Sequence, residues 1–107
     1  MHYDASILLV DDYEFIRTIL ERMLQQLGYQ NLRMAADGVD ALHLLRTRPV
    51  DLVITDYHMP EMDGIGLFQS MQQDPVLAKI PVLLISGVPT EKFVTQAPAI
   101  GLSLIHI

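Results

Sequence analysis

The chain contains no cysteine, so disulfide bonds and thiolate metal ligands are excluded. Positive charge is also scarce, because 7 Lys and Arg stand against 13 Asp and Glu, which gives a net charge of −6. Surfaces that bind nucleic acid or anionic membranes are normally basic, so we expect neither partner. No apolar run approaches the roughly 20 residues that cross a bilayer, and the N-terminus has no signal-peptide pattern. These absences predict a cytoplasmic protein.

The 107 residues, half of them hydrophobic, predict a single domain over residues 1–107 with one buried core. Short apolar runs alternate with stretches of helical periodicity. We expect strands at 7–10, 31–36, 51–55, 80–85 and 101–107, and helices at 16–27, 37–49, 63–74 and 89–98, the last broken at Pro98. Alternating strands and helices predict an α/β fold with a parallel sheet covered on both faces.

The first predicted helix carries an apolar stripe from Ile16 to Leu27, which we expect to lie in the core, with Gly28 ending the helix. Its charged side includes Glu14, Arg17 and Glu21. We interpret these residues as a solvated face, and a docking face is the alternative.

Three aspartates stand where two apolar strands end. Asp11 and Asp12 follow the first strand, and Asp56 follows the strand at 51–55. Right-handed crossovers bring the carboxyl ends of parallel strands to one edge of a sheet, so we expect the three carboxylates to meet there, together with Ser86. Their mutual repulsion favours a bound cation. Taken without Asp56, the acidic pair would more often be a helix N-cap with a solvated neighbour.

The segments ILLVDD, TDYHMPEMDG and IPVLLISG resemble the receiver domain of two-component response regulators, particularly the stand-alone chemotaxis type. The resemblance covers nearly the whole chain. It implies a flavodoxin-like, doubly wound parallel sheet of five strands in the order 2-1-3-4-5.

The resemblance also implies a role for each matching residue. Asp56 would accept the phosphoryl group, while Asp11, Asp12, Asp56 and the backbone carbonyl of His58 would hold Mg²⁺, for which Mn²⁺ can substitute. Ser86 would be the switch hydroxyl that hydrogen-bonds the phosphoryl group. Gly64 would allow a tight turn after the acceptor.

The implied partner is a sensor histidine kinase or a histidine phosphotransfer protein, with an unknown output partner. Such a domain catalyses its own phosphorylation and dephosphorylation, and we expect no turnover of an external substrate. A first alternative is a truncated or degenerate receiver that binds a partner without phosphorylation. A second is a Mg²⁺-dependent Asp-nucleophile phosphatase of haloacid-dehalogenase type, although that family has Asp-x-Asp where this chain has Asp11-Asp12-Tyr13.

Three features of the family have no counterpart in the sequence. Its lysine after the fifth strand and its final helix would both fall beyond Ile107, and Ile105 stands at its aromatic switch position. We therefore expect a receiver domain that is incomplete at its C-terminus. An uncovered fifth strand would lower stability or favour self-association through that strand.

Overall fold

The computed structural model describes residues 3–59, 61–86 and 102–106, with side chains as far as Ile85. The elements follow one another as β1 (Ser6–Val10), α1 (Glu14–Gln26), β2 (Asn31–Ala35), α2 (Gly38–Thr47), β3 (Leu52–Asp56), α3 (Gly64–Gln72), the short 3₁₀ helix η1 (Leu77–Lys79), β4 (Val82–Ser86) and β5 (Leu102–His106). The predicted helix at 89–98 lies outside the described residues.

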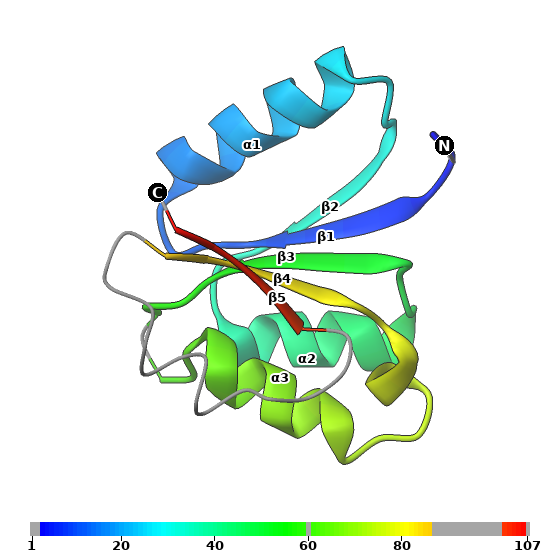
Figure 1. Ribbon diagram of the computed structural model, residues 1–107, viewed down its shortest axis with the longest axis vertical. Coiled ribbons are helices and arrows are strands. Elements are labelled where there is room, and N and C mark those ends of the chain that lie inside the picture. Colours follow the sequence, from blue (N-terminus) through cyan, green and yellow to red (C-terminus); the bar gives the residue numbers. More distant parts are fainter. Residues whose placement is uncertain (1–2, 60, 87–101, 107) are drawn as a thin grey trace.

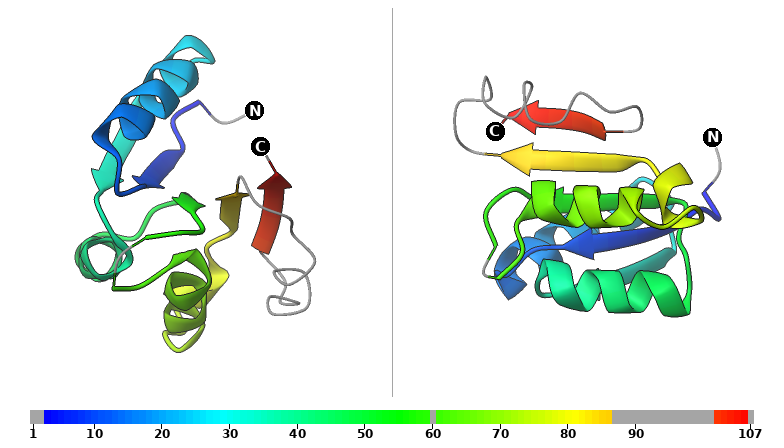
Figure 2. Two further views of the ribbon diagram at one scale, coloured as in Figure 1. Left: turned by 90° about the vertical axis from the view of Figure 1, so that its left-hand side faces the viewer. Right: turned by 90° about the horizontal axis from the view of Figure 1, so that it is seen from below.

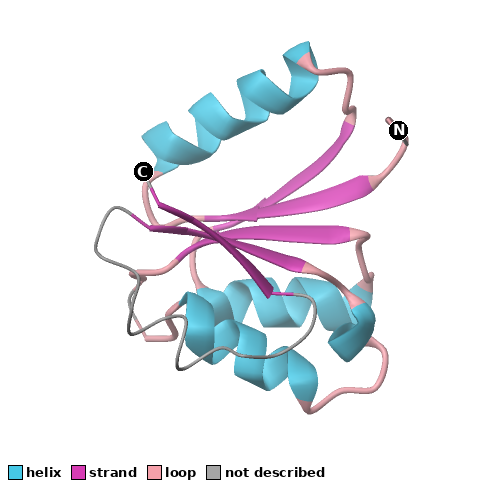
Figure 3. Cartoon of the chain, viewed as in Figure 1, coloured by secondary structure: helices cyan, strands magenta, loops and turns pink. Residues whose placement is uncertain are grey.

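The strands form one parallel sheet in the order β2-β1-β3-β4-β5, which confirms the predicted fold class and strand order. Figures 1 and 3 show α1 on one face of this sheet and α2 and α3 on the other. Because all strands run the same way, their carboxyl ends lie at one edge. This edge receives the ends of β1 and β3, which are neighbours in the sheet.

The residues of β1 alternate between two apolar layers. Leu8 and Val10 belong to the larger cluster, which includes side chains of α2 and α3. Ile7 and Leu9 belong to the smaller cluster on the opposite face, next to α1. Figure 2 shows the sheet from other sides, with α1 on one face and α2 and α3 on the other. Full burial of one such side chain stabilises the fold by about 1.5–3 kcal/mol, which explains why β1 is apolar on both faces.

The prediction that the apolar stripe of α1 lies in the core was wrong for most of its length. Leu20 and Leu24 pack against the smaller cluster, but no residue of α1 is fully buried. Met23 is 54% exposed and Leu27 is 63% exposed. The physical reason is that a single helix on one face of a sheet contacts it through a narrow stripe, so side chains beside that stripe remain accessible.

Side-chain caps and a glycine set several helix ends, close to the positions that the sequence predicted. Asp37 and Asp63 cap α2 and α3, and their side chains accept hydrogen bonds from the backbone N–H groups of Asp40 and Gly66. An N-cap of this kind contributes about 1 kcal/mol. Gly28, with a φ of 107°, ends α1 in a left-handed conformation that suits glycine.

Candidate functional site

The carboxylates of Asp11, Asp12 and Asp56 converge at the carboxyl edge of the sheet, as the sequence predicted. One oxygen from each residue lies within 4.8 Å of the other two. Two adjacent strand ends build this cluster: Asp11 and Asp12 follow the last residue of β1, and Asp56 is the last residue of β3. Three carboxylates this close repel one another unless protons or a cation compensate their charge.

Asp11 is the most buried member of the cluster, with 5% of its surface exposed. Its Oδ1 accepts a hydrogen bond of 2.8 Å from the backbone N–H of Tyr13. Its own backbone N–H donates to the carbonyl of Ala35, and its carbonyl accepts from the Arg17 guanidinium. Asp11 is therefore fixed on three sides by its neighbours.

Asp12 differs from Asp11 in having a buried carboxylate oxygen, Oδ1, without a hydrogen-bond partner in the described part of the chain. It does not cap α1, because the N-cap residue is Tyr13 and no side-chain cap is formed. The N-cap alternative for the acidic pair is thus excluded. Burying a polar oxygen without a partner costs about 1–3 kcal/mol, which a ligand at this position would offset.

Asp56 is half-buried and is held by its neighbours along the chain. Its Oδ1 accepts a hydrogen bond of 2.9 Å from the backbone N–H of Tyr57. The hydroxyl of the fully buried Thr55 donates to the Asp56 carbonyl at 3.0 Å. The first bond orients the carboxylate and the second holds the backbone at the end of β3, where the carboxylate lies beside the β1–α1 loop.

Burial is the main reason why the pKa values of Asp11 and Asp56 lie above the ordinary value for aspartic acid. Hydrogen bonds from Tyr13 and Tyr57 lower the pKa of Asp11 and Asp56, respectively. The charge of Asp12 raises both values. The charge of Arg17 lowers the pKa of Asp11, and the charge of His58 lowers the pKa of Asp56. Metal-free protein at neutral pH therefore carries unfavourable negative charge here.

This charge predicts a pH-dependent effect of Asp56→Asn. A raised pKa in the folded state gives stability that is present below the unfolded value and is lost as pH rises through the folded value. In EDTA, Asp56→Asn should therefore be more stable than the unsubstituted protein at neutral pH, and the difference should shrink as pH falls toward the ordinary aspartate range. Urea unfolding across this window measures it, with the exposed Asp40→Asn as control. A difference that does not depend on pH contradicts the prediction.

The loop between β3 and α3 returns the chain close to Asp56. Glu61 adopts a left-handed φ of 67°, which is uncommon for a residue other than glycine. Gly64 does not have a positive φ, so its predicted role in a tight turn needs a correction. A Cβ at Gly64 would lie 2.4 Å from a methyl carbon of Leu84 and 2.5 Å from the Asp56 carbonyl oxygen. Glycine is required there by lack of space.

Gly64→Ala is expected to lower the free energy of unfolding by about 1–3 kcal/mol, the usual cost of forcing extra volume into a packed site. The clash with the Asp56 carbonyl should also displace the end of β3. Gly66→Ala is a matched control in the same helix, because its Cβ would meet its nearest atom at 3.2 Å. Urea denaturation measures both variants. Equal stability of the two would refute the steric explanation.

Ser86 is the last residue of β4, the strand beside β3. Asp56 pairs in register with Ile85, so Ser86 follows by one residue along the same edge of the sheet. The side chain of His58 is exposed, and its ring lies edge-on to Tyr57 with centroids 4.7 Å apart. The fold thus brings the backbone of all the predicted site residues to one edge.

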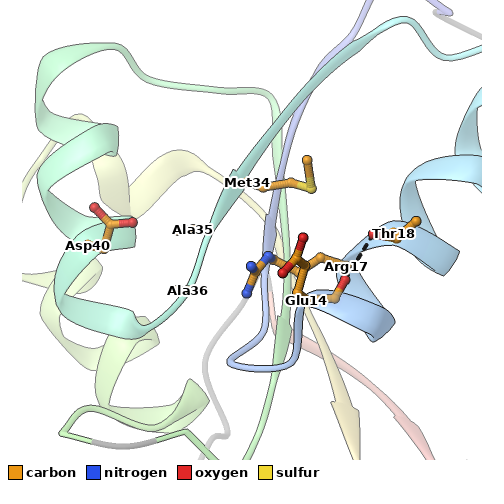
Figure 4. A pocket seen from close by; sticks show the side chains of 7 residues that line it. All are labelled: Glu14, Arg17, Thr18, Met34, Ala35, Ala36 and Asp40. Atoms are coloured by element: carbon orange, nitrogen blue, oxygen red, sulfur yellow. Dashed lines mark hydrogen bonds between the residues drawn. The ribbon is translucent and has the colours of Figure 1, made fainter.

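Arg17 is a residue whose position the sequence did not reveal. The sequence suggested a solvated charge on α1, yet the side chain is half-buried and donates to the carbonyl of Asp11. It also borders a cavity of about 330 Å³ between α1 and the end of β2, shown in Figure 4. The available signal was its position in the first turn of α1, six residues after Asp11.

The chain matches the protein family described as the response regulator receiver domain over residues 7–105. It is 34% identical over 103 residues to the chemotaxis protein CheY-3 of Vibrio cholerae, covering 96% of this chain and 79% of that protein. It is also 34% identical over 98 residues to CheY of Pseudomonas aeruginosa, covering 92% of this chain and 79% of the relative. The chain belongs to the response regulator receiver family.

Solved structures agree with this assignment. The structure of Vibrio cholerae CheY4 superposes with a TM-score of 0.86 at 27% identity, covering 96% of this chain and 86% of that one. The CheX–CheY–BeF₃–Mg²⁺ complex of Borrelia burgdorferi matches with a TM-score of 0.85 at 26% identity, covering 96% and 78%. The chain is a receiver domain of two-component signalling, as its motifs predicted, and a phosphoacceptor role fits this family.

Receiver domains are signalling proteins and not enzymes of the usual kind, so the phosphatase alternative is not supported by the comparisons. Receiver domains bind Mg²⁺ at an acidic pocket, and the aspartate cluster fits such a pocket. They interact with histidine kinases and other partners. Within the described ranges, no helix has both the length and the apolarity needed to traverse a membrane.

Proposed function

We propose that this chain forms one receiver domain that accepts a phosphoryl group on Asp56 from a phosphohistidine. The donor is a sensor histidine kinase or a histidine phosphotransfer protein. The observation that carries the proposal is the convergence of three carboxylates from two adjacent strand ends, with Asp56 at the end of β3. In the family motif that this segment matches, this position is the phosphoryl acceptor.

The donor atoms of the cluster suit Mg²⁺, because this ion prefers oxygen ligands and retains several waters. The buried Oδ1 of Asp12, which has no hydrogen-bond partner among the described residues, supports this fit, because a cation would satisfy it. Asp11, Asp12, Asp56 and the carbonyl of His58 would hold the ion, and Mn²⁺ can take the same ligands. When bound, Mg²⁺ supplies positive charge that reduces repulsion between carboxylate and phosphoryl oxygens.

The residues of the chain have distinct parts in the transfer. A carboxylate oxygen of Asp56 attacks phosphorus and forms a P–O bond, the P–N bond of the phosphohistidine breaks, and its electron pair returns to the imidazole. The Tyr57 N–H and the Thr55 hydroxyl hold the acceptor in place. The chain thereby catalyses its own modification and, later, hydrolysis of the acyl phosphate.

Ser86 would transmit the modification to the rest of the domain. A phosphoryl group adds a charge of about −1.5 to −2 and strong acceptor oxygens. A hydroxyl one residue beyond the partner of Asp56 can form a charge-assisted hydrogen bond to it and bias the β4 end toward a second conformation. We also expect an output partner for the domain, self-association through the fifth strand and a cytoplasmic location.

Incubation with acetyl phosphate and Mg²⁺, followed by intact-mass spectrometry, tests the proposed function. The expected result is a mass increase of one phosphoryl group that requires Mg²⁺ and is lost in hydroxylamine, as for an acyl phosphate. Mg²⁺ binding without labelling would instead favour a receiver that acts only as a binding module. Sustained phosphate release from a generic phosphomonoester would favour a phosphatase.

A further inference from the structure

The orientation of the Asp12 carboxylate depends on the backbone that carries it. Its buried Oδ1 has no hydrogen-bond partner in the part of the chain that the structure describes. Asp11 and Asp56, by contrast, each accept a hydrogen bond from a backbone N–H. The direction in which the Asp12 side chain leaves the backbone therefore depends on the peptide group that precedes it.

Asp11 and the peptide group that follows it are held on two sides. The backbone N–H of Asp11 donates to the Ala35 carbonyl at 3.2 Å. The carbonyl of Asp11, which belongs to the peptide plane leading into Asp12, accepts from Nη1 of Arg17. The peptide group is planar, so a hydrogen bond that fixes the Asp11 carbonyl also fixes the positions of the backbone N and Cα atoms of Asp12.

Arg17 is placed for this task by α1. Figure 4 shows the Arg17 and Glu14 side chains between α1 and the end of β2, at the rim of the 330 Å³ cavity. Arg17 is half-buried, and among the described residues its hydrogen bond goes to a carbonyl instead of a carboxylate. A guanidinium that bonds a backbone oxygen orients that oxygen and leaves the carboxylates free for a ligand.

We propose that Arg17 is a positioning residue that orients Asp12 for cation binding through the Asp11 carbonyl. The inference rests on the proposed function, because the cation is the Mg²⁺ that function requires. A positioning role and a purely electrostatic role of Arg17 predict opposite changes in Mg²⁺ affinity when Arg17 is substituted. If Arg17 acted only as a nearby positive charge, its removal would tighten Mg²⁺ binding by lowering repulsion. If it positions Asp12, its removal weakens Mg²⁺ binding.

Isothermal titration of the unphosphorylated chain with MgCl₂ tests the proposal. Arg17→Met keeps the length of the side chain but removes its donors, and it should weaken Mg²⁺ binding about tenfold, the usual loss for a hydrogen bond to a charged group. Arg17→Lys keeps charge and a donor and should bind Mg²⁺ with an intermediate affinity. Arg22→Met removes an exposed charge from the same helix and should not weaken binding.

The possible results separate the inference from the function on which it rests. Wild-type binding of Mg²⁺ together with unchanged or tighter binding by Arg17→Met would overturn the positioning role alone. Absence of binding by the wild type would overturn both proposals. Urea unfolding of each variant in EDTA adds a second readout: a purely structural role would lower stability there and leave the Mg²⁺ affinity of the folded protein unchanged.

Discussion

Asp56→Asn is expected to abolish incorporation of a phosphoryl group from acetyl phosphate and Mg²⁺. The amide has nearly the same shape as the carboxylate and can still accept the Tyr57 N–H bond at Oδ1, so the end of β3 should keep its structure. It lacks the anionic oxygen that attacks phosphorus. The loss should therefore be complete, where a distant substitution would only slow the reaction.

The control for this experiment is an isosteric substitution on the same chain. Asp40→Asn changes an exposed carboxylate in the first turn of α2 and should be labelled like the unsubstituted protein. Intact-mass spectrometry follows both variants over the same time course. A label that persists at full yield in Asp56→Asn would assign the acceptor to another residue.

Saturating Mg²⁺ is expected to stabilise the folded chain strongly, because the cation relieves repulsion among three carboxylates that lie within 4.8 Å. A ligand present at one hundred times its dissociation constant adds about 2.7 kcal/mol to the free energy of unfolding. For a domain of this size, that corresponds to a rise in Tm of about 10 °C. Thermal melts in EDTA and in MgCl₂ measure the shift.

Asp12→Asn should remove most of this stabilisation. A substitution of a second-shell partner commonly weakens metal affinity about 10- to 100-fold, so loss of a proposed ligand should cost at least as much. At the Mg²⁺ concentration used for the wild type, a hundredfold weaker site gains only about 0.4 kcal/mol. In EDTA the variant should be at least as stable as the wild type, since one repelling charge is gone. An unchanged Mg²⁺ shift would exclude Asp12 as a ligand.

Stability and function are opposed at this cluster. Burial and the neighbouring negative charges raise the pKa of Asp11 and Asp56, so the charged site is unfavourable without a cation. The same charge attracts Mg²⁺ to the place where the phosphoryl group must arrive. Site residues that lower stability in the absence of a ligand are common where binding requires desolvated charge.

The sequence alone determined the order of elements and the position of the acidic cluster. Apolar runs such as 7–10 are too short for helices and lack the alternation of half-exposed strands, which predicts a parallel sheet. Once the sheet is parallel, the residues after its strands must share an edge, and Asp11 and Asp56 follow from that geometry. The motifs around them supplied the family.

Only the tertiary structure decided what each site residue contacts. The apolar pattern of α1 suggested a core stripe, but most of that stripe is exposed because one helix contacts the face of the sheet along a narrow line. The role of Arg17 depends on its hydrogen bond to the Asp11 carbonyl, and the need for glycine at position 64 depends on the nearby side chain of Leu84. The contact of Gly64 with Leu84 joins segments distant in the chain, so it depends on packing that no local pattern encodes.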